Sequence, residues 1–209
     1  MRSTGGGAVT VADAPTGRTR AKADRREALL AAAARLFAER GFNGVSIEEL
    51  GAAVGVSGPA VYRHFHGKQE VLAALLIDVS AKLLDGGHAV VDAADGDRAA
   101  IGSLVRFHVE FALGHPDVIR VQDRDLDSLA PTDRHRVRAL QREYVDLWIE
   151  VLGGLHPGAD AAARRIRSLA VFGLINSTPH SARVGGGTAP EVVVRPLLEQ
   201  MALSALLGD

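Results

Sequence analysis

The stretch VSGPAVYRHF, from Val56 to Phe65, decides the fold of this chain. Its serine, Ser57, can accept a hydrogen bond from the free N–H groups that begin a helix, as N-cap residues do. Pro59 then falls in the first helical turn, where a missing N–H costs little. The stretch therefore predicts a very short helix, too short to serve as an ordinary element of a helical domain.

A second helix is expected immediately upstream, in SIEELGAAVG. Ser46 and Glu49 have the spacing of a capping box, Leu50 and Val54 form an apolar stripe, and Gly55 ends the helix. Apolar residues at three- and four-residue spacing predict a further helix before these two: Leu30, Ala33 and Phe37, with Gly41 at its end. Three such helices, with a glycine-containing turn between the second and the third, make a helix-turn-helix unit.

On a wheel of 100° per residue, Val61 and Phe65 of the short helix fall together and face the other two helices. Arg63 lies nearly opposite them. The residues that flank it are Pro59, Ala60 and His64. An arginine on this face can donate two hydrogen bonds to a guanine in the major groove. The side chains that can reach DNA phosphates are Tyr62, His64 and Lys68, and the helix N-termini suited to a phosphate are those capped by Ser46 and Ser57.

Other roles stay open for single residues of this region. The Tyr62 ring can instead pack at a helix junction, and Ser46 can be a cap and nothing more. His64 and His66 form a His-x-His pair, but no third ligand of suitable type lies near them in the sequence, so no metal or other cofactor is expected.

The stretch GVSIEELGAAVGVSGPAVYRHFHGKQEVLAALL resembles the DNA-binding region of TetR-type bacterial transcriptional regulators, over residues 24–77. The resemblance implies an all-helical dimer, usually a repressor that a small ligand releases from DNA. By position, it implies base-facing residues Gly58, Ala60 and Arg63, and backbone-contacting residues Ser46, Ser57, Tyr62, His64 and Lys68. Gly51 departs from the family's usual alanine and is expected to loosen its helix by up to about 1 kcal/mol. Gly58 has no side chain to read a base, so specificity would depend on Arg63 and on DNA shape.

Composition is that of a globular protein, with 47% hydrophobic and 23% charged residues and no cysteine. No apolar run reaches the length that spans a bilayer, and a cytoplasmic protein is expected. Residues 1–68 hold ten Lys or Arg and six Asp or Glu, whereas residues 69–209 hold fourteen and nineteen. Only the basic N-terminal part is suited to a polyanion.

Residues 1–20 are expected to form a flexible N-terminal tail, residues 21–67 the helix-turn-helix domain, and residues 68–209 a helical bundle for ligand binding and dimerisation. The basic segment GRTRAKADRR is either a solvated leader or an arm that follows phosphates or enters a minor groove.

The rest of the chain is also expected to be helical, without convincing strands. The expected helices cover residues 68–85, 99–113, 117–129, 132–155, 159–178 and 190–207. Gly86 and Gly87 are expected to stop the first of them, and residues 184–190 to form a loop. Pro196 is expected to kink the last helix or to mark its true start.

A ligand pocket is expected where polar or aromatic residues interrupt apolar helix faces. The candidate lining residues are Phe107, Phe111, Tyr144, Trp148, Phe172 and Asn176. A weaker resemblance of this half to TetR regulators of fatty-acid or acyl-CoA metabolism implies an acyl-CoA or another elongated apolar effector. Apolar stripes on the last two helices suit a four-helix dimer interface: Leu169, Phe172, Leu197, Leu198 and Met201. Arg124 is expected to be paired on the surface.

Two other functions are alternatives to a ligand-controlled regulator. An enzyme is disfavoured because the sequence has no glycine-rich phosphate loop, no nucleophile elbow and no cluster of carboxylates or histidines at ligand spacing. A DNA-binding dimer without a small-molecule ligand, regulated by a protein partner, stays open. If a ligand does act, it is expected to shift helix 68–85 and so to change the spacing of the two recognition helices.

Overall fold

The chain is all-α, as expected, in a computed structural model that describes residues 17–181, 183–184 and 187–208. None of the helices in these ranges is both long and apolar enough to cross a membrane. The α-helices are α1 (Gly17–Arg40), α2 (Ile47–Ala53), α3 (Gly58–Val61), α4 (Lys68–Asp92), α5 (Asp97–Gly114), α6 (Pro116–Asp125), α7 (Pro131–Leu155), α8 (Ala161–Asn176), α9 (Thr178–Ser181) and α10 (Glu191–Leu207). Two 3₁₀ turns, η1 (Phe42–Gly44) and η2 (Leu126–Ser128), and two strands, β1 (Arg183–Val184) and β2 (Gly187–Thr188), complete the elements.

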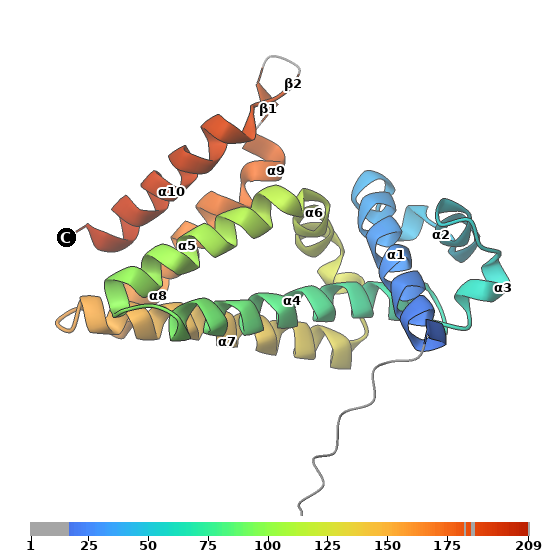
Figure 1. Cartoon of the computed structure of the whole chain (residues 1–209), viewed down its shortest axis with the longest axis horizontal. Coiled ribbons are helices and arrows are strands. Elements are labelled where there is room, and N and C mark those ends of the chain that lie inside the picture. Colours follow the sequence, from blue (N-terminus) through green and yellow to red (C-terminus); the bar gives the residue numbers. More distant parts are fainter. Residues whose placement is uncertain (1–16, 182, 185–186, 209) are drawn as a thin grey trace, which may run out of the picture.

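The helices α1, α2 and α3 form a small unit at one end of the molecule, and α4 leads from it into the remaining helices (Figure 1). The capping box predicted at the start of α2 is present, with the Ser46 side chain accepting from Glu49 N and the Glu49 carboxylate accepting from Ser46 N. Gly41 and Gly55 have φ values of 78° and 70°, the left-handed region that glycine adopts without steric cost. Both sharp turns of the unit therefore depend on glycine.

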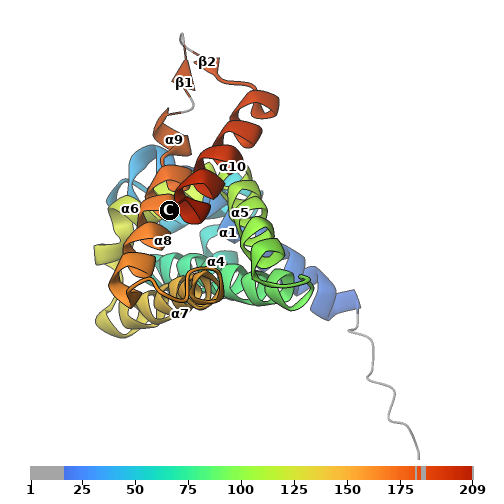
Figure 2. The same ribbon diagram turned by 90° about the vertical axis from the view of Figure 1, so that its left-hand side faces the viewer.

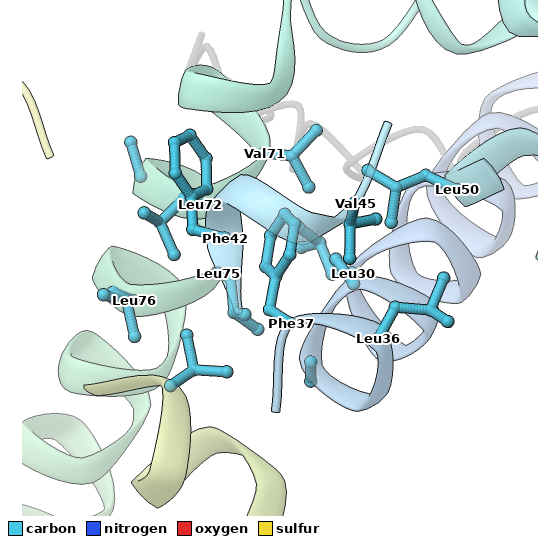
Figure 3. Packing of buried hydrophobic residues seen from close by; sticks show 14 of the residues in the cluster. Leu30, Leu36, Phe37, Phe42, Val45, Leu50, Val71, Leu72, Leu75 and Leu76 are labelled. Atoms are coloured by element: carbon cyan, nitrogen blue, oxygen red, sulfur yellow. The ribbon is translucent and has the colours of Figure 1, made fainter. Parts of the chain in front are cut away.

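A continuous apolar core fills this unit and extends beyond it (Figure 3). Phe37, Phe42 and Leu72 join α1, η1 and the start of α4, and the ring centroids of the two phenylalanines lie 5.6 Å apart. Val118 of α6 and Val137 of α7 belong to the same core. The core therefore crosses residue 68, where the sequence suggested a domain boundary.

The prediction that Gly86 and Gly87 stop the fourth helix was wrong, because α4 continues to Asp92. A Cβ at Gly86 would lie 2.3 Å from the Phe107 ring, and one at Gly87 would lie 2.5 Å from the Tyr144 ring. Both glycines thus allow α5 and α7 to approach α4 closely, and neither one ends the helix. Glycine is unfavourable inside a helix by only about 1 kcal/mol, which tertiary packing outweighs.

A second core joins α4, α5, α7, α8 and α10. Its largest fully buried side chains include Trp148, Ile101 and Leu152. Helix α10 begins at Glu191 and contains Pro196 in its interior, so this proline does not mark the start of the helix.

A two-residue antiparallel pair, β1 with β2, follows α9 and projects from the bundle (Figure 2). The expectation of no strands, and of an irregular loop over residues 184–190, is corrected by this pair. A two-residue ladder has no room for the period-two pattern that identifies a strand from sequence.

The first helix begins at Gly17, inside the segment expected to be a tail. The basic residues from position 18 onward therefore belong to the opening turns of α1. The rest of the segment expected to be a flexible tail, residues 1–16, lies outside the described residues.

Candidate nucleic-acid interface and internal cavities

The short helix α3 turns one face inward and one face outward. Val61 and Phe65 are buried, as the helical wheel predicted, while Tyr62 is 52% exposed and Arg63 is also exposed. The helix is shorter than predicted, with Tyr62 as its C-cap, and residues 62–64 continue as turns. Ser57 occupies the N-cap position, but its side chain makes no capping hydrogen bond, which corrects the prediction for that residue.

Gly51 sets the distance between α2 and the turn that precedes α3. A Cβ at this position would lie 2.8 Å from the Val56 carbonyl oxygen and 3.1 Å from Val61 Cγ2. The Gly51 carbonyl also accepts from Val56 N, at 2.9 Å. The expectation that this glycine loosens α2 is therefore replaced by a packing role, because the missing side chain lets the turn sit directly on the helix.

Positive charge gathers around His64. Burial of its ring, and then the charges of Lys22, Arg25, Arg26 and Arg63, lower the pKa of His64. The first turns of α1 therefore lie close to the turn that follows α3, where Arg26 Cζ is 5.4 Å from the centroid of the Phe65 ring, although the two segments are about forty positions apart in the sequence. His64 Nδ1 is buried and has no hydrogen-bond partner among the described residues.

Two residues predicted to contact phosphates already bond within the chain. The Ser46 hydroxyl donates to Glu49 Oε2 at 2.9 Å, and Arg40 pairs with the other Glu49 oxygen at 2.6 Å. The hydrogen bond from the Ser46 backbone N–H, followed by those from Arg40 and from the Ser46 hydroxyl, lowers the pKa of Glu49 to about 2. Lys68 Nζ donates to the Phe42 carbonyl at 2.8 Å and lies 4.4 Å from the centroid of the Phe42 ring.

In the second half of the chain, His108 is the centre of an aromatic cluster. Its ring lies within 6.1 Å, centroid to centroid, of each of four neighbours: Phe111, Tyr144, Trp148 and Phe172. His108 Nε2 lies 3.2 Å from Asn176 Oδ1, and Nδ1 lies 3.5 Å from the Tyr144 hydroxyl. The amide oxygen can only accept, so Nε2 carries the proton and Nδ1 can accept from the tyrosine. Burial lowers the pKa of His108 to about 4, so the ring is neutral at pH 7.

Beside this cluster lies an inner cavity of about 80 Å³. The residues that line it are Ser80, Leu83, His108, Phe111, Ile119, Gln122, Gln141, Tyr144, Val145, Phe172 and Asn176. Four of the six predicted ligand-binding residues thus line one cavity. Trp148 is fully buried and does not line the cavity.

A second hollow, the outer groove, has a volume of about 440 Å³ and runs between α1, α4, α5 and α6. Its lining includes the predicted residues Phe107 and Phe111, together with Leu30, Ala31, Ala34, Leu75, Val79, Leu83 and Val118, and at the rim Glu27, Asp78, Lys82, Glu110 and His115. The sequence did not reveal the contribution of α1, because Leu30 and Ala34, which line the groove, belong to the same apolar stripe as the core of this helix.

Apolar side chains are exposed on α8 and α10, two helices that pack against each other. The exposed ones on these helices are Ile166, Leu169, Val192, Val193, Leu197 and Met201. Three of the residues predicted for a dimer interface are in this set, whereas Phe172 and Leu198 are buried within the chain.

This fold and the outward face of α3 define a helix-turn-helix DNA-binding protein. Residues 29–75 match the model described as bacterial regulatory proteins, tetR family, and residues 96–205 match the model described as tetracyclin repressor-like, C-terminal domain. The second match alone covers more than half of the chain, which therefore belongs to the TetR family of transcriptional regulators. Members of this family are DNA-binding transcription factors, so the chain is not an enzyme.

Named relatives and solved structures agree with this assignment. The chain is 28% identical over 143 residues to the transcriptional repressor KstR2 of Rhodococcus jostii, covering 66% of this chain and 68% of that protein. It is 30% identical over 88 residues to the transcriptional activator FasR of Mycolicibacterium smegmatis, but that alignment covers only 42% of this chain and 40% of FasR. A TetR-family regulator of Bordetella parapertussis superposes with a TM-score of 0.75 at 24% identity, over 86% of this chain and 94% of that one. The ketosteroid regulator KstR2 of Mycobacterium tuberculosis superposes with a TM-score of 0.71 at 20% identity, over 88% of this chain and 93% of that one.

Proposed function

We propose that the chain is a repressor that binds a palindromic operator as a homodimer in the cytoplasm and leaves it when a small apolar or acyl-CoA-type effector binds. In this proposal residues 21–67 bind DNA, and residues 68–209 bind the effector and form the dimer. Most of the relatives whose names state repression or activation are called repressors, although FasR is called an activator.

The observation that carries the proposal is the outward face of α3. Arg63 is exposed there, beside a half-exposed Tyr62, and the cations of α1 that depress the pKa of His64 extend the positive charge. Arginine can read guanine bidentately, and the neighbouring cations can neutralise phosphates. We assign base contact to Gly58, Ala60 and Arg63, and backbone contact to Ser57, Tyr62 and His64. Ser46 and Lys68 are assigned backbone contact as well, and both also donate within the chain, which holds them beside η1 and α2.

The dimer is supported by the exposed apolar side chains of α8 and α10. Such a patch on a protein surface usually marks an interaction site, and two packed helices from each of two copies make a four-helix interface. The effector is supported by the inner cavity and the outer groove, since a solid bundle would favour the alternative of a dimer controlled by a protein partner.

The test is a selection of genomic fragments by the purified chain, followed by fluorescence anisotropy on the recovered duplex. Arg63→Ala should weaken binding by about 1–3 kcal/mol, or about 5- to 150-fold. Arg138→Ala, on the exposed surface of α7, is the matched control and should bind as the unchanged chain does. If the Arg63 variant binds every recovered duplex as tightly as the unchanged chain, the proposed recognition face is wrong.

A further inference from the structure

The inner cavity and the outer groove share a wall. Leu83 of α4 and Phe111 of α5 line both hollows. Phe111 is partly buried and packs against both hydrophobic cores. These two side chains therefore stand between the inner cavity and the outer groove, and the hollows are adjacent.

The inner cavity is lined by uncharged groups. Among the described residues that form its wall, none is an Asp, Glu, Lys or Arg. Burial keeps His108 neutral, with a pKa of about 4, and raises the pKa of Tyr144, so neither carries charge at pH 7. An ionised group placed here would lose its hydration without gaining a counter-charge, which is strongly unfavourable.

The inner cavity also offers hydrogen-bond donors. Gln141 lines the cavity. Its Nε2 is buried and has no hydrogen-bond partner among the described residues. Asn176 uses its amide oxygen to accept from His108, which leaves its amide N–H groups as donors. A buried donor without an acceptor is costly, so the group that fits this cavity is an uncharged acceptor such as a carbonyl.

The outer groove suits a hydrocarbon. Its floor is apolar, and its volume of about 440 Å³ lies within the range of ordinary ligand sites. The rim carries three carboxylates, Glu27, Asp78 and Glu110, against one lysine, Lys82, and Asp78 already pairs with Arg26 at 2.8 Å. An anionic group at the rim meets more negative than positive neighbours, which disfavours a carboxylate or the phosphates of coenzyme A.

We propose that the effector is an elongated, uncharged molecule that places a carbonyl-type acceptor in the inner cavity and its apolar body in the outer groove, past Phe111. This inference rests on the proposed function as a ligand-responsive regulator and chooses between the effector classes allowed there. The walls of the groove include α1 from the DNA-binding unit and α4, α5 and α6, so the bound body touches both parts and biases how they pack.

The chain's sole tryptophan, Trp148, reports on the inner cavity by its fluorescence, because its ring centroid lies 4.8 Å from that of Phe172, which lines the cavity. The unmodified chain is titrated at pH 7 with 2-dodecanone, dodecanoate, dodecylammonium and dodecanoyl-CoA. We expect 2-dodecanone to bind at least tenfold more tightly than each charged probe. Equal or tighter binding of any charged probe, or no response to 2-dodecanone, overturns the inference.

Two variants separate the halves of the site. Gln141→Leu removes the unpaired donor and should weaken 2-dodecanone about tenfold, whereas Glu143→Leu, at an exposed position of α7, should not. Ala31→Phe fills the groove from α1 and should weaken 2-dodecanone at least tenfold while leaving 2-pentanone unchanged. Ala28→Phe is its control, because Ala28 is exposed on α1 and does not line the groove. Equal effects on long and short ketones would contradict the shared site.

Fluorescence anisotropy on the operator duplex, measured in parallel, tests the proposed function separately from this inference. Operator binding without the expected ketone preference overturns the inference and leaves the regulator. The expected preference without affinity for any duplex supports the inference and overturns the proposed function.

Discussion

The guanidinium of Arg124, on α6, donates a hydrogen bond to the main-chain carbonyl of Phe37, near the end of α1. The Phe37 carbonyl also accepts from Gly41 N at 2.7 Å, so the guanidinium is a second donor to it, at the negatively polarised end of the helix. A second donor of Arg124 reaches the Ala38 carbonyl at 3.4 Å, and the buried carboxylate of Asp125 pairs with the guanidinium at 3.1 Å. The second half of the chain is thereby joined to the DNA-binding unit at a point away from α4.

Arg124→Ala should lower the free energy of unfolding by about 1–2 kcal/mol, because it removes charge-assisted hydrogen bonds and leaves Asp125 without its cation. Urea denaturation followed by circular dichroism measures the change. Arg134→Ala removes an exposed ion pair with Asp127 and should cost less than about 1 kcal/mol. Equal losses in both variants would show that the contact with α1 adds nothing.

Gly87→Ala should lower the free energy of unfolding by about 1–2 kcal/mol, since the new methyl group would overlap the Tyr144 ring and force α4 away from α7. Thermal and urea unfolding of both proteins give the difference. Gly114→Ala is the control, because a Cβ there meets nothing within 4 Å. The control should be as stable as the parent chain or slightly more so, and a Gly87 variant that behaves like it would contradict the close helix contact.

Acid should destabilise the protein through His108. Its pKa is lowered from 6.5 to about 4 in the native state, so between these values the unfolded chain binds a proton that the native chain does not. Stability from this group is complete above pH 6.5 and is lost as the pH falls toward 4, by up to about 3 kcal/mol. His108→Phe should show a correspondingly smaller drop in urea midpoint between pH 7.5 and pH 4.5. Parallel pH profiles for the two proteins would rule out this titration.

Leu197→Glu should convert the proposed dimer to a monomer, because a carboxylate would be buried among the apolar side chains of α8 and α10. Light scattering after size exclusion, at micromolar protein, measures the mass. Ala28→Glu, at an exposed position of α1, should leave the dimer intact. If the parent chain is itself monomeric at these concentrations, the proposed dimer interface is ruled out.

The local signals of the sequence predicted the DNA-binding unit well. The capping box at Ser46 and the inward positions of Val61 and Phe65 depend on spacing within one or two helical turns, which sequence displays directly. The ends of helices without such signals were less certain. Gly86 and Gly87 were misread as a stop because the reason for them, the rings of Phe107 and Tyr144, comes from helices further along the chain.

The cavities were predictable only in part. Aromatic and polar residues on apolar faces pointed to Phe111, Tyr144, Phe172 and Asn176, which do line the inner cavity, but the same pattern included Trp148, which does not. Whether such a residue faces a cavity or fills the core depends on a few tenths of an ångström in the packing of neighbouring helices, and no single helix encodes that distance.

The sequence by itself determined that this chain is helical, where its helix-turn-helix unit lies and which face of the short third helix is buried, because caps, glycines and apolar spacing act over a few residues. The tertiary structure alone decided that α1 brings its cations beside the turn after α3, that Arg124 bonds to the last turn of α1, and that Leu83 and Phe111 stand between two hollows. Those relationships join residues tens of positions apart, and they exist only once the helices have packed.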